Sequence, residues 1–139
     1  MNYLFSFCFF SLIIIALSPL QSFKWKNRII LLSGQDSIVV EQLNRYKKYM
    51  EDVKERNILI IYSQQNKFKI FPAGNHPKIS FQETVKYYKL SDKFSSLLIG
   101  KDGGIKSKDD TLLLPNTYFA QIDGMPMRQQ EIRNKQKHK

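Results

Sequence analysis

The chain has 139 residues, of which 42% are hydrophobic and 24% charged, and its formal net charge is +10 at pH 7. This length suits one domain with a single hydrophobic core and argues against a multidomain protein. The positive charge favours anionic partners but does not specify a fold.

An apolar stretch at the N-terminus is typical of a secretory signal. Residues 4–17 include only two polar side chains, both serines, and no charged one. The stretch is short for a transmembrane helix. We therefore expect residues 1–22 to form a signal peptide that is cleaved near Ser22. The segment before the stretch lacks Lys and Arg, so an uncleaved membrane anchor remains the alternative.

Cys8 is the sole cysteine of the chain and lies inside this apolar stretch. Cleavage near Ser22 therefore yields a mature chain without a thiol. Such a chain forms no disulfide and performs no thiol redox chemistry. All charged residues lie beyond Ser22, so the mature chain keeps the full positive charge.

The first half of the remaining chain predicts a strand, a helix and a second strand. Residues 29–32, which follow Arg28 and are closed by Ser33, and residues 58–62 are continuous apolar runs, which favour strands buried on both faces. Apolar residues between 36 and 56 recur at helical spacing, so one amphipathic helix is expected there. A strand, crossover helix and strand predict a right-handed parallel pair. Trp25, just before the first strand, is expected to close one end of the core.

The second half predicts three more strands and two more helices. Residues 67–71 alternate charged and apolar side chains, as a half-exposed edge strand does. A capping-box pattern opens a helix over 80–90, residues 94–99 and 105–108 form a hairpin, and a proline starts a last helix over 115–125.

This order predicts an α/β domain with a thioredoxin-like mixed sheet of four to five strands, flanked by three helices. The domain is expected to span residues 23–128. Beyond Arg128 only one residue is apolar, so residues 129–139 are expected to be a frayed, basic polar tail.

Three segments resemble a known family. They are FSSLLIGKDGGIK at residues 94–106, IDGMPMRQQE at residues 122–131, and FKWKNRIILLSG at residues 23–34. The chain resembles the P-DUDES family, also described as domain of unknown function 4174, which occurs in secreted bacterial proteins and in animal extracellular proteins such as sushi-repeat proteins. The resemblance implies an exported thioredoxin-like fold, distantly similar to peroxiredoxins, with no established activity.

The position of a thioredoxin-like active site argues against redox chemistry. A reactive cysteine would lie after the first strand, at the N-terminus of the first helix. This chain has Gly34, Gln35, Asp36 and Ser37 there, and no proline at residues 91–93 before the third core strand. Gln35, Asp36 and Ser37 remain candidate ligand-binding residues, although Asp36 or Ser37 also suits a helix cap.

A glycine-rich turn at Gly100–Gly104 contains Lys101 and Asp102. Exposed backbone N–H groups and a lysine could bind phosphate, but a phosphate loop opens into a helix, whereas a strand follows here. The turn therefore favours a hairpin in which Asp102 and Gly103 adopt positive φ. Lys101 and Asp102 stay as candidate ligand-binding residues.

The segment Met125–Arg128 reads MPMR and has two interpretations. As a C-terminal latch, Pro126 stops the last helix, the methionines cover the core, and Arg128 pairs with Asp123 or Asp102. As a ligand site, Arg128 offers its planar guanidinium to a carboxylate or phosphate. The latch is favoured.

Metal and cofactor binding are not expected. The only histidines are His76, in a loop, and His138, near the C-terminus, so clustered metal ligands are lacking.

The sequence thus favours a monomeric, non-catalytic binding module in the periplasm or outside the cell. Its partner would be an unknown protein or an anionic envelope component, not nucleic acid, and it would touch the membrane only through residues 1–22 if these remain. One alternative is a peroxiredoxin-derived enzyme with non-thiol chemistry at Gln35, Asp36, Ser37 and Arg128. A membrane-anchored structural protein is another.

Overall fold

A computed structural model describes residues 17–139 of the chain. The expectations for residues 1–16, which hold Cys8 and most of the signal peptide, lie outside the described residues. Within residues 17–139, no helix is both long and apolar enough to cross a bilayer.

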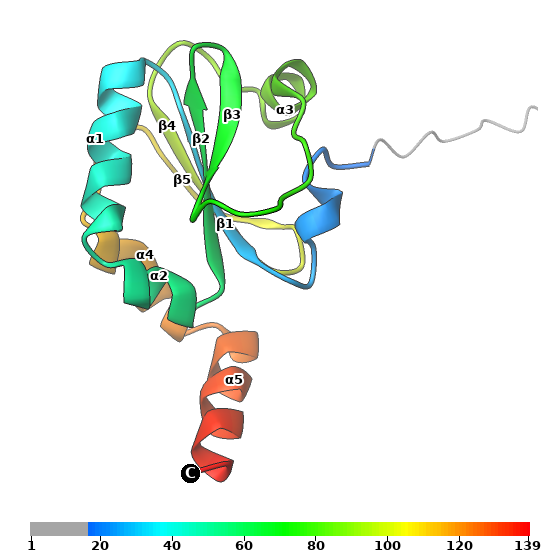
Figure 1. Ribbon diagram of the computed structural model, residues 1–139, viewed down its shortest axis with the longest axis vertical. Coiled ribbons are helices and arrows are strands. Elements are labelled where there is room, and N and C mark those ends of the chain that lie inside the picture. Colours follow the sequence, from blue (N-terminus) through cyan, green and yellow to red (C-terminus); the bar gives the residue numbers. More distant parts are fainter. Residues whose placement is uncertain (1–16) are drawn as a thin grey trace, which may run out of the picture.

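A five-stranded mixed sheet forms the centre of the domain, with helices on both faces (Figure 1). The elements in chain order are the 3-10 helix η1 (Gln21–Phe23), β1 (Arg28–Ser33), α1 (Asp36–Lys47), α2 (Met50–Glu55), β2 (Ile58–Gln64), β3 (Lys67–Phe71), α3 (Phe81–Tyr88), β4 (Ser95–Ile99), β5 (Ile105–Asp109), α4 (Pro115–Asp123) and α5 (Pro126–Lys137).

The strand order is β3-β2-β1-β4-β5, with β1 at the centre. β1 and β2 are parallel and joined through α1 and α2, whereas the pairs β2–β3, β1–β4 and β4–β5 are antiparallel. The predicted α/β class and thioredoxin-like mixed sheet are therefore confirmed.

Both faces of the central strands are buried, which explains their continuous apolar runs. Ile30 and Leu32 of β1 pack with α1, α2 and α4 on one face. Ile29 and Leu31 pack on the other face with Leu20, Phe23 of η1 and Tyr88 of α3. β3 and β5 lie at the two edges and are much more exposed.

The single helix predicted over residues 36–56 is divided into α1 and α2, because the chain makes a turn at Lys48 and Tyr49. The predicted cap of α1 was also wrong. Gln35 holds the N-cap position without a side-chain cap hydrogen bond. The Asp36 carboxylate instead accepts a hydrogen bond from the backbone N–H of Gln65 at 3.2 Å, in the turn between β2 and β3.

The prediction that Trp25 closes the core was wrong. Trp25 is 62% exposed, and its backbone has a positive φ of 66°. The Lys24 ammonium lies over the indole ring, 5.3 Å from the ring centroid. Leu20 and Phe23 fill that end of the core instead and are 4% and 3% exposed.

The folded unit therefore begins before residue 23, where the predicted domain starts. Ser18 Oγ lies 3.0 Å from the Tyr88 hydroxyl of α3, and Leu20 is part of the core. Cleavage at Ser22 would remove both contacts.

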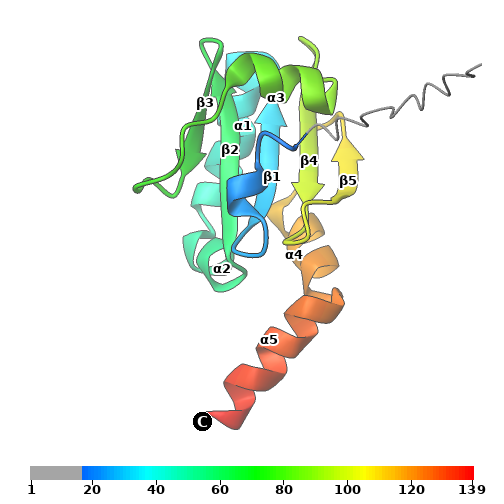
Figure 2. The same cartoon turned by 90° about the vertical axis from the view of Figure 1, so that its right-hand side faces the viewer.

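The polar tail was predicted to be frayed, but it forms the helix α5, which projects away from the sheet (Figures 1 and 2). α4 ends at Asp123, two residues before the end of the predicted helix at residue 125. Pro126 then opens α5 rather than only ending α4. A proline fits this place because the first N–H groups of a helix have no partner within it.

Candidate functional site

The candidate ligand-binding residues fall at opposite ends of β1. Gln35 and Asp36 follow its C-terminal end, whereas Lys101 and Arg128 lie near its N-terminal end, beside Arg28. The six residues of β1 span about 17 Å. The structure thus does not bring together the residues that the alternative enzyme hypothesis would combine.

A cavity of about 340 Å³ opens at the C-terminal ends of β1 and β2. We call it the serine pocket. It is lined by Ser33 and the residues that follow it, by Ser63 of β2, and by Phe81 and Val85 of α3. Ser37 lies outside this pocket, in a separate surface depression on α1. The serine pocket occupies the place where a thioredoxin-like fold carries its reactive group.

Three serines form a row across the sheet beneath the α3 face. The register pairs Ser33 of β1 with Ser95 of β4, and it places Ser63 of β2 beside Ser33, one step beyond the pair Leu32–Tyr62. On this face of the sheet the two preceding rows are entirely apolar; they are Ile29, Leu59, Ile99 and Leu31, Ile61, Leu97.

The serine row is buried but not fully hydrogen bonded. Ser33 and Ser63 are each 4% exposed, and among the described residues the hydroxyls of Ser63 and Ser95 have no hydrogen-bond partner. Sequence reasoning missed this row. The available signal was a serine at one end of each of three apolar runs, but only the strand register shows that the three share a face.

The rim of the serine pocket carries carboxylates and neutral polar groups. Asp36 and Asp92 are exposed there, beside the amides of Gln35 and Asn66. Among the described residues, no lysine or arginine lines the pocket.

Gly34 shapes the pocket by letting two strands approach. Its φ is +132°, and a Cβ atom at this position would lie 2.7 Å from the Cα of Phe94. No other residue type fits there without a shift of the backbone.

The serine pocket lacks the groups of a nucleophilic site. A serine nucleophile needs a positioned base, usually a histidine. His76 does not line the pocket; its Nε2 lies 3.0 Å from the carbonyl oxygen of Pro72. Within residues 17–139, no group of three or more His, Cys, Asp or Glu side chains is placed to hold a metal ion.

An ion-pair network, which we call the Glu131 cluster, occupies the other end of β1. Arg28 is 1% exposed and donates from both terminal nitrogens to the Glu131 carboxylate, each at 3.2 Å. Lys101 donates to the same carboxylate at 2.5 Å. Glu131 belongs to α5, so these bonds tie that helix to the sheet.

Arg128 serves as a latch in this cluster. It is 2% exposed, pairs with Asp123 at 3.2 Å, and donates to Glu55 at 3.0 Å. Its Nη1 also lies 3.6 Å from Glu131. Asp123 was one of the two predicted partners, whereas Asp102 pairs with Lys106. With its guanidinium occupied, Arg128 is not available to an external ligand.

The two methionines next to Arg128 differ in their burial. Met125 packs against the core as the latch interpretation expects. Met127 is exposed and does not cover the core.

The carboxylates of the Glu131 cluster have lowered pKa values. Burial alone would raise the pKa of Glu131, but hydrogen bonds from Lys101 and Arg28 outweigh this and hold the pKa below its usual value. Burial is likewise outweighed at Asp123, whose pKa is lowered by hydrogen bonds from Arg56 and Arg128.

The glycine-rich turn is a hairpin and not a phosphate loop. β4 and β5 pair antiparallel across it, and Gly103 donates to the carbonyl oxygen of Gly100 at 3.0 Å. Gly103 has φ of +82°, but the positive φ predicted for Asp102 is not found. The Asp102 carboxylate accepts hydrogen bonds from Lys106 and from the backbone N–H of Gly104. These two hydrogen bonds hold the pKa of Asp102 below its usual value.

Comparison with curated proteins and with solved structures gave no match. A family profile described as domain of unknown function (DUF4174) matches residues 19–131. This match starts beside the buried Leu20 and ends at Glu131, whose carboxylate pairs with Arg28. The chain therefore belongs to the DUF4174 family.

Proposed function

We propose that the chain is a non-catalytic binding module that acts outside the cytosol and binds an anionic component of the cell envelope. The exposed basic helix α5 is the observation that carries this proposal. The export part rests on the apolar N-terminal stretch. The non-catalytic part rests on the residues that follow β1, where this chain has no cysteine.

The acidic groups near α5 are already paired within the domain. The carboxylates of Glu131, Asp123 and Glu55 neutralise three cations of the Glu131 cluster, namely Arg28, Lys101 and Arg128. The cluster therefore contributes little charge to the surface, and the surplus of positive charge lies elsewhere.

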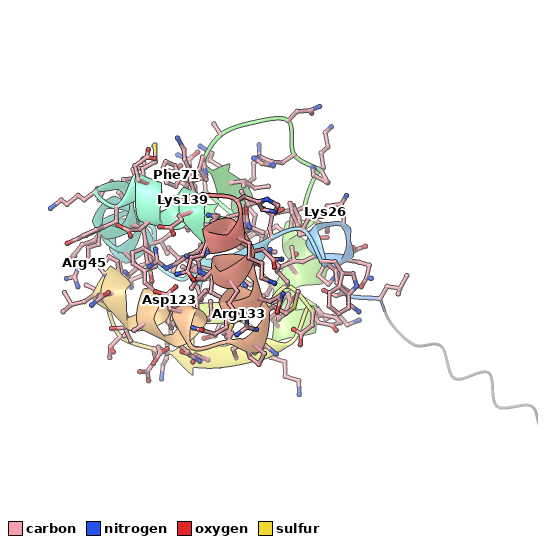
Figure 3. All side chains as sticks on the ribbon, turned by 90° about the horizontal axis from the view of Figure 1, so that it is seen from below. Lys26, Arg45, Phe71, Asp123, Arg133 and Lys139 are labelled. Carbon is pink, nitrogen blue, oxygen red and sulfur yellow. The ribbon has the colours of Figure 1, made fainter. Side chains whose placement is uncertain are left out.

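Beyond Glu131 the chain carries only positive charges. Arg133, Lys135, Lys137 and Lys139 are exposed, and residues 132–139 include no acidic side chain. Figure 3 views the molecule from the α5 end and labels Arg133 and Lys139 on this segment. Lysines close to an anionic surface each contribute about 1 kcal/mol of binding free energy at moderate salt.

Vesicle binding tests this proposal. The exported protein is mixed with vesicles of phosphatidylglycerol or of phosphatidylcholine, and binding is followed by sedimentation at rising salt. We expect binding to phosphatidylglycerol only, weakened by salt because the contacts are screened.

A triple variant tests the role of α5. Replacing Lys135, Lys137 and Lys139 by Gln should weaken binding about 100-fold. The matched control replaces Lys67, Lys69 and Lys86, which lie on β3 and α3, by Gln and changes the net charge equally. Equal losses in both variants would show that net charge, and not α5, determines binding.

A further inference from the structure

We propose that the serine pocket binds an uncharged, hydroxyl-rich ligand, that is, a saccharide. This site is distinct from α5, because it lies at the opposite end of β1.

Two members of the serine row, Ser33 and Ser63, line the pocket and provide hydrogen-bonding groups. Ser63 is 4% exposed, and its hydroxyl has no hydrogen-bond partner within residues 17–139. Buried polar groups are usually hydrogen bonded, so an unpartnered one needs an explanation. The preceding rows on this face are apolar, so an apolar side chain would be the ordinary choice here as well. A hydroxyl both donates and accepts, and so does each hydroxyl of a sugar.

The charges at the pocket argue for an uncharged ligand. The carboxylates of Asp36 and Asp92 line it and no cation does, so an anion meets repulsion at close range. The whole chain carries +10, which disfavours the approach of a cation. A neutral ligand avoids both effects.

The opposite wall of the pocket is apolar. Phe81, Val85 and Leu90 line it, and the Phe81 ring is held by Phe68 with ring centroids 5.1 Å apart. An apolar wall facing a polar floor and rim suits a sugar ring, which presents C–H groups on its faces and hydroxyls around its edge. The cavity of about 340 Å³ has the size of a small ligand site.

Amide chemical shifts measured by NMR provide the test. The exported protein is titrated with glucose, N-acetylglucosamine, maltose and cellobiose up to ~50 mM. Acetate and putrescine serve as charged probes. We expect saturable shifts of the amides of Gly34, Asn66 and Ser91 with at least one saccharide, unchanged by added salt, and none with the charged probes. Shifts with acetate or putrescine alone, or with no probe, would overturn the proposal.

The variant Ser63→Ala removes the hydroxyl and adds no atom to this buried position. We expect saccharide affinity to fall about tenfold, the loss of roughly one hydrogen bond. The control Ser37→Ala lies outside the pocket and should bind like the original chain. Ser63→Ala should unfold at an equal or higher urea concentration, because it removes an unpartnered buried group. Unchanged affinity, or a loss of stability in Ser63→Ala, would assign the serine a structural role and refute the proposal.

Discussion

Glu131 holds α5 to the domain, and the substitution Glu131→Gln tests this directly. The change keeps the size of the side chain and removes its charge. Arg28 would then lie almost fully buried with the carbonyl oxygen of Arg56 as its remaining strong acceptor, and Lys101 would lose its carboxylate.

Removing one partner of a buried ion pair costs about 3–5 kcal/mol. The Glu131 side chain is partly exposed, and the amide oxygen of Gln still accepts one hydrogen bond, so we expect the lower end, about 3 kcal/mol. The free energy of unfolding is measured by urea denaturation followed by circular dichroism.

The matched control is Glu51→Gln, which removes an exposed pair with Lys54 at 3.9 Å. Such surface pairs contribute about 0–1 kcal/mol. Amide hydrogen exchange gives a second readout. α5 is polar on all sides and short, so without its anchor it should lose protection before the sheet does. If Glu131→Gln costs no more than Glu51→Gln and α5 stays protected, the anchoring role is refuted.

Three further predictions concern stability. Leu20→Ala should cost about 2–3 kcal/mol in urea denaturation, because it removes a buried side chain from the core; a cost near zero would place residues before 23 outside the folded unit. The lowered pKa values of Glu131 and Asp123 predict stability that is full above about pH 4 and lost as the pH falls through the folded-state values. The urea midpoint measured from pH 7 to pH 3 should therefore fall less steeply for Glu131→Gln than for the original chain. Gly34→Ala should cost about 1–3 kcal/mol, whereas Gly124→Ala should be nearly neutral, since Gly124 has negative φ and a Cβ atom there makes only ordinary contacts.

Local pattern was sufficient to predict the sheet. Residues 29–32 and 58–62 are apolar without interruption, and runs of this length are typical of strands covered on both faces. The alternation at residues 67–71 likewise indicated an edge strand, which the structure confirms.

The errors arose where distant contacts decide the local structure. α5 has no apolar face, so its sequence alone resembles a disordered tail. Glu131 bonds to Arg28, 103 positions earlier in the chain, and this contact gives the helix its support. Leu20 directly follows the apolar stretch, so the sequence alone did not mark it as a core residue, whereas the structure packs it into the core at the end where Trp25 was expected.

The serine row belongs to a third kind of feature, which depends on strand register. Ser33, Ser63 and Ser95 each look like an ordinary residue at the end of an apolar run. Pairing β1 with both β2 and β4 places them side by side, so their common role becomes visible only in the assembled sheet.

The two proposed sites differ in their response to salt, and this separates them in one experiment. Binding at α5 depends on exposed lysines, so raising salt from low to physiological concentration should weaken the binding of phosphatidylglycerol vesicles. Binding in the serine pocket depends on hydrogen bonds to an uncharged ligand, so the same change should leave saccharide affinity unaltered. The triple α5 variant should weaken vesicle binding and leave saccharide affinity unchanged, while Ser63→Ala should do the reverse. Loss of both activities in either variant would mean that the two ends of β1 act as one site, contrary to their separation in the fold.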